Sequence, residues 1–328
     1  MKKVLIIRFS SIGDIVLTTP IIRCVKQQME DVEIHYLTKK TFAGLLINNP
    51  YISKVHCLEA NLNDTIDILQ KENFDCIIDL HKNIRTFRVK MKLKVPSFTF
   101  NKLNIEKWLL VKLKINILPK VHIVDRYFKA VKSLGVVNDN KGLDYFIDEK
   151  DKVNSLPEAF QKGYIAIVTG GKHVTKQIPE NILIKICNNI NTPIILLGGK
   201  EDFDKTELVR TKSTNKDIMN ACGSYNINQS ASIIEQAAKV ITGDTGLMHI
   251  AAAFKKEIIS LWGNTVPEFG MYPYLPKGEE NKSTIMEVKG LSCRPCSKLG
   301  YDKCPIQHFN CMNLINIDTI INTINNKL

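Results

Sequence analysis

The stretch KVLIIRFSSIGD, residues 3–14, decides the fold of this chain. Residues 3–9 form an almost continuous apolar run, which is typical of a parallel strand covered on both faces. Residues 10–14 form a turn of small residues, and apolar residues at helical spacing follow over residues 15–29. The order strand, tight turn and helix predicts the first unit of a parallel α/β sheet.

Strands and helices alternate along the rest of the chain in two series. The first series has expected strands at 32–37, 55–58, 76–80 and 144–147, with helices at 41–47, 64–71, 106–113 and 123–134 and a less regular segment at 82–104. The second series has expected strands at 164–169, 193–197, 240–242 and 258–262, with helices at 179–189, 230–238, 246–254 and 318–328.

The two series predict an α/β fold with two Rossmann-like, doubly wound domains. We place the N-terminal domain at residues 1–155 and the C-terminal domain at residues 156–328, with a polar linker over 149–157. Two facing domains of this kind usually bind ligand in a central cleft at the carboxyl ends of their strands.

Composition narrows the class of protein. The 328 residues include 45 Lys and Arg against 33 Asp and Glu, a net charge of +12 that favours acidic partners or reflects a composition rich in Lys, Asn and Ile throughout. No apolar run approaches the roughly 20 residues that span a bilayer. Arg8 and Asp14 interrupt what would otherwise resemble a signal peptide, and nine cysteines, an odd number, argue against a secreted disulfide framework. We expect a cytoplasmic protein.

The first candidate site lies in the turn that contains Ser10, Ser11 and Gly13. These small residues allow close approach of a ligand to the backbone, and the helix that follows presents free N–H groups. Asp14 stands at the start of that helix, where capping is the ordinary role of an aspartate. The turn has no G-x-G-x-x-G pattern, which argues against a nicotinamide dinucleotide site.

The second candidate site is the turn TGDTGLMH, residues 242–249. Glycines and Thr245 at a helix start favour binding of an anion such as a diphosphate. His249 falls one turn into the helix, on the face of Thr245. The alternative is an Asp-Thr cap with a buried histidine, and we favour the binding site because Gly, Thr and His meet at one helix mouth.

Two further loops follow strands of the second domain. Residues 169–179, which begin at Thr169, are rich in glycine and carry Lys172 and Lys176, which suit phosphate although the spacing is not that of a P-loop. Glu201, in the loop 198–201, could accept hydrogen bonds from ribose hydroxyls or a base amine. The Asp-x-Asp pair that follows it is more typical of a solvated helix start than of a metal site.

A basic segment follows the strand that ends near residue 80. No acidic residue occurs between Asp79 and Glu106, and Lys82, Arg85 and Arg88 are among the cations between them. A solvated helix face explains such a run, but its place after a strand end also suits an acidic acceptor or an anionic lipid leaflet. Few aromatic residues intervene, so single-stranded nucleic acid is disfavoured.

Four cysteines lie close together near the C-terminus. The spacing C-x2-C-x7-C-x6-C matches the ligand count of a structural zinc site but not the spacing of the common zinc ribbons. Free thiols that pack a loop are the alternative. The four residues are Cys293, Cys296, Cys304 and Cys311.

These segments together resemble one family, the lipopolysaccharide heptosyltransferases of glycosyltransferase family 9. The resemblance runs over nearly the whole chain and rests above all on VLIIRFSSIGDIVLTTPII (residues 4–22) and ITGDTGLMHIAAAF (residues 241–254). TKQIP and GGKE fall between them in the order the family shows, and the Cys-rich segment resembles one found in many members. The resemblance implies the GT-B fold, with an acceptor-binding N-terminal domain and a nucleotide-sugar-binding C-terminal domain.

The resemblance also implies roles for individual residues. Asp14 matches the family's catalytic base, and the residues before it match the loop that frames the donor. Lys176 matches a lysine that meets the nucleotide diphosphate, and Glu201 matches a carboxylate on the nucleoside side. The start of the pyrophosphate-binding helix is matched by Asp244, Thr245, Gly246, Leu247 and His249.

The family implies inverting transfer of heptose from ADP-L-glycero-D-manno-heptose to the lipopolysaccharide inner core, either Kdo-lipid A or a heptosyl core. It implies no metal for the chemistry and an enzyme peripheral to the inner face of the cytoplasmic membrane. The chain departs from the family at His81-Lys82-Asn83, where members often have Gln-Gly. The alternatives are therefore another nucleotide sugar for a different surface glycan, or a non-catalytic nucleotide- or lipid-binding protein.

Overall fold

The computed structural model describes residues 1–325, which divide into two compact units. The first unit contains Met1–Leu103 and Val121–Phe146, and the second contains Asn104–Lys120 and the chain from Ile147 onward. The change of unit after Phe146 lies before the expected boundary at residue 155. The excursion 104–120 was not expected; it groups with the second unit because Leu110 packs against Val266 and Phe269.

The sheet of the first unit has five parallel strands in the order β3-β2-β1-β4-β5. Its strands are β1 Lys2–Ile7, β2 Val32–Lys39, β3 Lys54–Leu58, β4 Cys76–Asp79 and β5 Ser97–Thr99. β1 lies in the centre and is fully buried from Val4 to Ile7, as the apolar run predicted. The strand order reverses between β1 and β4.

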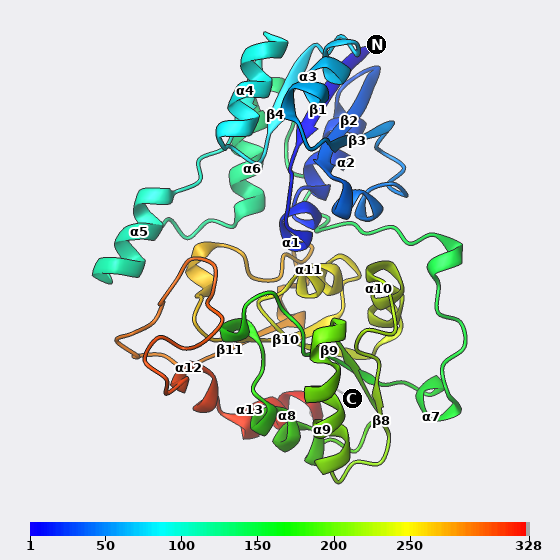
Figure 1. Ribbon diagram of the computed structural model, residues 1–328, viewed down its shortest axis with the longest axis vertical. Coiled ribbons are helices and arrows are strands. Elements are labelled where there is room, and N and C mark those ends of the chain that lie inside the picture. Colours follow the sequence, from blue (N-terminus) through cyan, green and yellow to red (C-terminus); the bar gives the residue numbers. More distant parts are fainter. Residues whose placement is uncertain (326–328) are drawn as a thin grey trace. The chain divides into compact units, whose positions relative to one another are not determined.

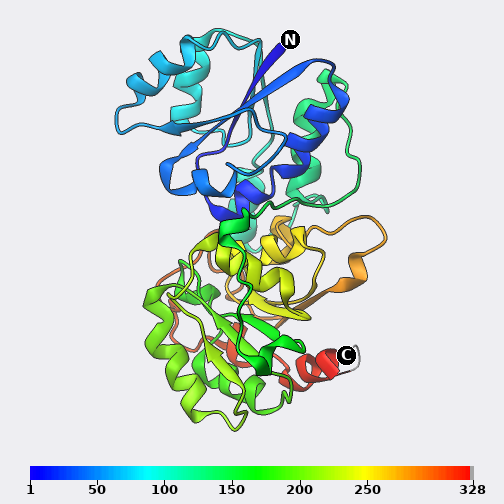
Figure 2. The ribbon, with the colours of Figure 1, turned by 90° about the vertical axis from the view of Figure 1, so that its right-hand side faces the viewer.

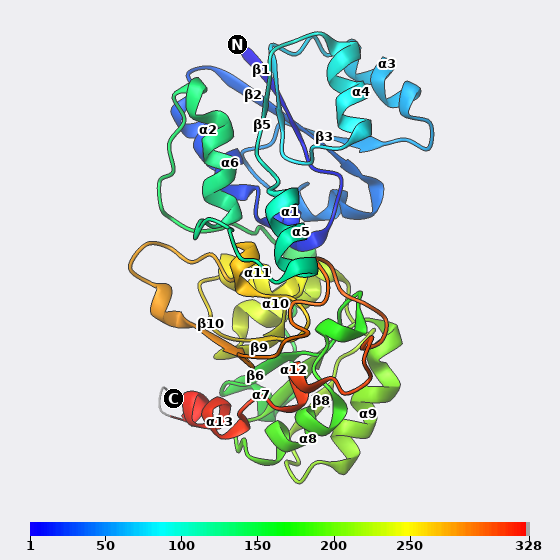
Figure 3. The same cartoon turned by 90° about the vertical axis from the view of Figure 1, so that its left-hand side faces the viewer.

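Helices cover both faces of this sheet. They are α1 Ile12–Val16, α2 Thr19–Gln28, α3 Leu62–Gln70, α4 Ile84–Leu93 and α6 Ile123–Val131, with 3-10 turns η1 Lys40–Leu45 and η2 Lys132–Leu134. α3 and α4 lie together on one face, and α2 and α6 lie together on the other (Figure 1; Figure 3). The face below α3 and α4 is packed with aliphatic residues of β1, β2 and α3.

The sequence predictions for this unit missed the strand β5 and were wrong at four further elements. The expected helix 15–29 is two helices, because Pro20 has no N–H and lies in the first turn of a new helix, α2. The expected helix 41–47 is the 3-10 turn η1, and 144–147 is not a strand. α4 lies in the segment that was thought less regular, because apolar residues also occupy its exposed face and obscure the period.

The sheet of the second unit has six parallel strands in the order β11-β10-β9-β6-β7-β8. Its strands are β6 Ile165–Val168, β7 Ile194–Leu197, β8 Ile218–Asn220, β9 Lys239–Gly243, β10 Glu257–Trp262 and β11 Ser283–Glu287. The chain runs outward from β6 to β8, returns to β9 and then runs outward to β11. The strand order therefore reverses between β6 and β9.

The second unit also has helices on both faces of its sheet. α8, α9 and α13 pack on one face, and α10 and α11 lie together on the other (Figure 1; Figure 2). The helices are α5 Asn104–Leu113, α7 Glu158–Gln161, α8 Glu180–Asn188, α9 Phe203–Lys212, α10 Ile227–Gln236, α11 Gly246–Ala253, α12 Asn310–Asn313 and α13 Ile317–Asn325. The 3-10 turns are η3 Glu149–Asp151, η4 Val174–Lys176, η5 Lys200–Asp202, η6 Pro267–Phe269 and η7 Glu280–Lys282. The terminal helix was expected to run to residue 328, and its last three residues lie outside the described part of the chain.

Within residues 1–325, every helix is too short or too polar to cross a bilayer.

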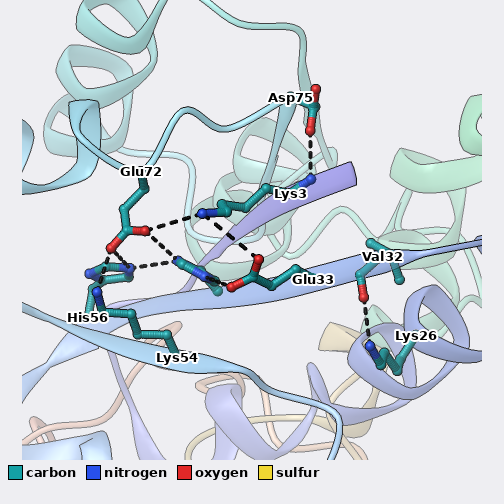
Figure 4. A network of polar contacts seen from close by, with 9 residues as sticks. Lys3, Lys26, Val32, Glu33, Lys54, His56, Glu72 and Asp75 are labelled. Carbon is teal, nitrogen blue, oxygen red and sulfur yellow. Dashed lines mark hydrogen bonds and ion pairs between the residues drawn. The ribbon is translucent and has the colours of Figure 1, made fainter. Parts of the chain in front are cut away.

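A buried histidine pair joins β2 to β3 in the first unit (Figure 4). His35 Nδ1 lies 2.9 Å from His56 Nε2, and His35 Nε2 lies 2.7 Å from a carboxylate oxygen of Glu33. Because Glu33 accepts the Nε2 proton of His35, the lone pair of His35 Nδ1 accepts the proton of His56 Nε2. This arrangement gives each of the two facing ring nitrogens a hydrogen-bond partner.

Glu72 lies beside the histidine pair and closes the network. Its oxygens lie 3.8 Å from ring nitrogens of His35 and His56, a spacing that could hold a metal ion. Lys54 Nζ, however, lies 2.6 Å from one oxygen of Glu72 and Lys3 Nζ lies 3.4 Å from the other. Two lysines already neutralise the carboxylate, so we interpret this group as a structural network.

The network predicts that stability falls as the solution is acidified. Burial, followed by repulsion from His35, lowers the pKa of His56 from 6.5 to about 4. Between pH 6.5 and pH 4 the unfolded chain therefore binds a proton at His56 that the folded chain does not. The contribution of His56 to stability is complete above pH 6.5 and declines toward pH 4. From pH 7 to pH 5 this group should remove about 2 kcal/mol of unfolding free energy.

Urea denaturation of the wild type and of His56→Gln at pH 7 and pH 5 measures this effect. We expect the wild type to lose about 2 kcal/mol more than the variant between the two pH values. Between pH 7 and pH 8, where the histidine is neutral in both states, the two proteins should show the same slope. Equal losses between pH 7 and pH 5 would contradict the assignment.

Candidate active site

In each unit the candidate residues lie where the strand order reverses. The carboxyl ends of β1 and β4 carry the loops that contain Asp14 and His81, and the carboxyl ends of β6 and β9 carry the loops that contain Lys176 and Asp244. Reversal points of doubly wound sheets leave a crevice at the carboxyl edge, which is where such folds bind ligands. Each unit therefore has one site defined by topology.

Asp14 is held by its own helix turn and by Arg8, which directly follows β1. One oxygen accepts hydrogen bonds from the backbone N–H of Ser11 at 3.1 Å and from its hydroxyl at 2.8 Å. The other oxygen lies 2.6 Å from Nη2 of Arg8. The carboxylate keeps 19% of its surface exposed, so it is fixed in orientation without being sealed from solvent.

Arg8 connects this carboxylate to the rest of the sheet. Its Nε donates to the carbonyl of Ser10 at 2.8 Å, and its Nη1 donates to the carbonyl of Leu80 at 2.6 Å and to the hydroxyl of Tyr127 at 3.3 Å. The side chain of Arg8 is only 10% exposed. Sequence reasoning missed its role, although a charged residue in an otherwise apolar, buried strand is the signal that would have indicated it.

The charge state of Asp14 follows from these contacts. Burial opposes ionisation, but the Arg8 guanidinium and the two Ser11 donors outweigh it and lower the pKa of Asp14 below 3.8. The carboxylate is therefore ionised at neutral pH and can accept a proton, although its basicity is reduced by the cation beside it.

His81 extends the site at the end of β4. Its ring lies against Phe9, with 4.8 Å between the ring centroids, and Asp79 accepts the His81 backbone N–H at 3.0 Å. Burial, followed by the charges of Arg8 and Lys102, lowers the pKa of His81 from 6.5 to about 4. A neutral imidazole thus occupies the position at which the sequence departs from the family pattern.

The predicted acceptor cations are distributed along the start of α4. Arg85 lies over the ring of Phe9, with its guanidinium carbon 5.2 Å from the ring centroid, and so joins the Asp14 loop. Lys82 is exposed in the turn before the helix, at a φ of 49°. Arg88 is exposed further along α4 and donates to the side-chain oxygen of Asn63 at 3.2 Å. Arg85 therefore contacts the loop that follows β1.

In the second unit an ion pair joins the two loops at the reversal point. Lys176 Nζ lies 2.7 Å from Oδ2 of Asp244, which also accepts the hydroxyl of Thr265 at 2.9 Å. The loops approach so closely that a Cβ on Gly243 would lie 2.2 Å from the carbonyl oxygen of Lys176. Glycine is required there because no side chain fits between the two backbones.

α11 begins at this ion pair and presents its N-terminal amides. Thr245 is the N-cap residue, but its hydroxyl lies 3.2 Å from that of Thr242 and makes no cap bond to the helix. Gly246 and Leu247 are half-buried, so their N–H groups stand at a partly open helix end that favours an anion. His249 is only 2% exposed and belongs to the interior of the unit rather than to the open surface.

The remaining donor-site predictions fall on the flanking loops. The hydroxyl of Thr169 donates to the carbonyl of Leu197 at 3.1 Å, and the residue is fully buried, so its side chain supports the sheet edge. Glu201 is exposed at η5 and is free to meet a ligand. Asp202 is buried and accepts the N–H of Gly199 at 2.9 Å, whereas Asp204 is exposed in the first turn of α9. The Asp-x-Asp pair thus starts a helix, as expected.

The Cys-rich segment packs against the loop that carries Lys176. The N–H of Thr175 donates to the carbonyl of Tyr301 at 3.1 Å, and the N–H of Tyr301 donates to the hydroxyl of Thr175 at 2.8 Å. A Cβ on Gly300 would lie 2.5 Å from Cβ of His173. The segment therefore fixes the position of the residue that precedes Lys176.

The four late cysteines influence one another but do not form a complete ligand set. Burial, then the neighbouring Cys293 and Cys304 thiols, raises the pKa of Cys296, and burial raises the pKa of Cys311 to about 12. Sγ of Cys293 also lies 4.0 Å from Nε2 of His308. Within residues 1–325, no three of these sulfur and nitrogen atoms all lie within 4.8 Å of one another, whereas the ligand atoms of His35, His56 and Glu72 do. Thiolate and imidazole donors are nevertheless of the chemical type that binds zinc or iron.

Comparison with known proteins shows which protein family this chain resembles. Residues 65–300 match the family described as Glycosyltransferase family 9 (heptosyltransferase). The chain is 26% identical to lipopolysaccharide heptosyltransferase 1 of Campylobacter coli over 289 residues, which cover 80% of this chain and 84% of that protein.

Solved structures show the same fold. Escherichia coli ADP-heptose lps heptosyltransferase II superposes with a TM-score of 0.75 at 17% identity, over 99% of this chain and 98% of that chain. Escherichia coli heptosyltransferase WaaC with ADP superposes with a TM-score of 0.68 at 16% identity, over 99% and 100% of the two chains. The predicted two-domain GT-B architecture is confirmed by these similarities.

We predict that the late cysteines bind one zinc or iron ion and that the ion stabilises the Lys176 loop. Metal analysis of protein purified without chelator should find about one ion per chain, and removal by a thiol-competitive chelator should lower the Tm. Cys296→Ser with Cys304→Ser should abolish the metal and weaken ADP binding, because Tyr301 then no longer holds Thr175. Cys57→Ser, in the first unit, is the control and should change neither. Metal-free protein with an unchanged Tm would show that the thiols only pack the loop.

Proposed function

The chain belongs to glycosyltransferase family 9, and we propose that it transfers a heptose from an ADP-heptose donor to the inner core of lipopolysaccharide. The family assignment makes it a glycosyltransferase. The donor and acceptor are proposed from the relatives, which include lipopolysaccharide heptosyltransferases and a heptosyltransferase structure with ADP.

One observation carries the proposal: each unit has, at its reversal point, one of the two groups that glycosyl transfer requires. The first unit supplies a fixed, ionised carboxylate, Asp14, and the second supplies a cation and free helix amides at Lys176 and Gly246. Transfer needs a base for the acceptor hydroxyl and stabilisation of the departing diphosphate.

We assign the proton transfer to Asp14. In an inverting step, an acceptor oxygen attacks the anomeric carbon from the face opposite the diphosphate while Asp14 takes the proton of that hydroxyl. The bond between the anomeric carbon and the phosphate oxygen breaks, and its electron pair leaves with ADP. Arg8 orients Asp14 and the chain around it and is assigned no contact with a substrate, so it is a positioning residue.

We assign the leaving group to the second unit. The developing charge on ADP would be met by Lys176 and by the amides of Gly246 and Leu247, with Thr245 at the helix start. Glu201, exposed on the neighbouring loop, would accept hydrogen bonds from the nucleoside. The chemistry as proposed uses no metal, and the Cys-rich segment would serve only to hold the loop.

The acceptor would lie against the start of α4. Arg85 stands beside the Asp14 loop and Lys82 precedes the helix, so both can pair with the acidic groups of a phosphorylated glycolipid. The neutral His81 lies where the sequence departs from the Gln-Gly of the family pattern, and we propose that it adjusts acceptor choice. The acceptor's lipid anchor would require the enzyme to work peripherally at a membrane surface.

We predict that Asp14→Ala lowers kcat about 10²–10⁴-fold while the affinity for the ADP-sugar stays unchanged, because only the proton acceptor is lost. Product formation from ADP-heptose and a Kdo-lipid A acceptor measures turnover, and titration calorimetry measures donor binding. Asp67→Ala, an exposed aspartate on α3, is the matched control and should retain full activity. Turnover of Asp14→Ala near the wild-type value would exclude the base role.

We predict that Lys176→Ala weakens ADP binding about 10–100-fold, which is the usual effect of a lost charge-assisted hydrogen bond. Lys172→Ala, in the same loop but exposed, is the control and should bind ADP as the wild type does. A panel of ADP, UDP and GDP measured by thermal shift tests the nucleotide at the same time. An unchanged ADP affinity in Lys176→Ala would remove this lysine from the donor site.

A further inference from the structure

Helix α4 exposes a row of apolar side chains. Ile84, Phe87 and Met91 are 80%, 59% and 59% exposed, although residues of these types are usually buried. Their spacing of three and four residues places them on one face of the helix. Thr86 and Val89, on the opposite face, are buried against the sheet of the first unit. The apolar row is therefore additional to the face that anchors α4.

A row of cations runs beside the apolar row. Arg85, Arg88 and Lys92 each follow one of the apolar residues by one position, and all three are exposed. The sequence has no acidic residue between Asp79 and Glu106. α4 thus has three longitudinal zones: a buried zone, an exposed apolar zone and an exposed basic zone.

We propose that α4 is the site at which this protein lies on an anionic lipid bilayer. A helix parallel to the surface would insert Ile84, Phe87 and Met91 between the headgroups and place the basic row on lipid phosphates. Each basic residue near such a surface strengthens binding about fivefold. The inference extends the proposed function, because an acceptor anchored in a leaflet is reached only from that leaflet, but its test does not depend on transfer.

The apolar and basic rows of α4 also argue against other binding partners for this surface. A second copy of the chain docked symmetrically on this row would bring Arg85, Arg88 and Lys92 close to their equivalents, and like charges oppose that contact. A nucleic acid would use the basic row but would leave Ile84 and Met91 exposed, since it binds through phosphates and stacked aromatic rings. A bilayer with acidic headgroups satisfies both rows at once.

Vesicle co-sedimentation separates the contributions of the two rows. The wild type should bind phosphatidylcholine vesicles that contain phosphatidylglycerol and should bind pure phosphatidylcholine much less. The variant Ile84→Ser, Phe87→Ser and Met91→Ser should lose about tenfold or more in affinity for the acidic vesicles. Arg88→Gln with Lys92→Gln should lose a similar factor, and that loss should shrink as salt is raised. Arg85 is left intact because it contacts Phe9.

The control keeps the number of removed apolar side chains constant. Ile47→Ser, Ile68→Ser and Val137→Ser remove three residues of the same unit that are 69%, 43% and 64% exposed, and this variant should bind vesicles as the wild type does. Circular dichroism checks that all variants are folded. Vesicle affinity of the α4 apolar variant within about twofold of the wild type would overturn the proposal, as would equal loss in the control.

A soluble acceptor without acyl chains distinguishes this inference from the proposed function. The α4 apolar variant should transfer sugar to that acceptor at the wild-type rate and lose activity only toward acceptor embedded in vesicles. If no protein transfers heptose to either acceptor, the proposed function fails while the vesicle result still decides the lipid contact. Equal activity of variant and wild type on embedded acceptor would contradict the role of α4.

Discussion

The ion pair between Arg8 and Asp14 is the constraint on which the first unit's site depends. A buried guanidinium is stable only where each of its donors is met, and Arg8 meets the carbonyls of Ser10 and Leu80 and the carboxylate of Asp14. These partners come from the β1 loop, the end of β4 and the first turn of α1. One side chain therefore fixes the reversal point of the sheet and the direction of the proposed base together.

In the second unit, backbone packing fixes the position of the candidate site residue Lys176. Gly243 lets the β9 loop touch the carbonyl of Lys176, and the Cys-rich segment holds Thr175 from the other side. Lys176 is thus placed by contacts to the main chain around it rather than by a buried hydrogen-bond network. A loop fixed in this way can be stabilised by a remote metal site without the ion ever meeting a substrate.

Much of this could be predicted from the sequence, because apolar strands followed by small-residue turns define a doubly wound sheet and its reversal points. This pattern located the loops around Asp14 and Lys176, whereas the roles predicted for the two residues came from the resemblance to the family. Arg8 was missed because its partners at Leu80 and Tyr127 are distant in sequence. α4 was missed because apolar residues on its exposed face hide the helical period, and the excursion 104–120 was missed because the contact of Leu110 with Phe269 is non-local.

The charges of both sites are neutralised within their own units before any substrate arrives. Asp14 is paired with Arg8, and Lys176 is paired with Asp244. Under the proposed function, the Lys176–Asp244 pair would separate when the donor binds, whereas the Arg8–Asp14 pair would stay intact. A diphosphate must compete with Asp244 for Lys176, so donor binding exchanges one ion pair for another, and the helix amides add to the affinity. Arg8 stays with Asp14 and lowers the basicity of the carboxylate. Proton transfer to Asp14 is therefore most favourable after the acceptor hydroxyl has begun to bond to the anomeric carbon, because the hydroxyl has then become acidic. That coupling makes the proton transfer late and ties it to departure of the diphosphate.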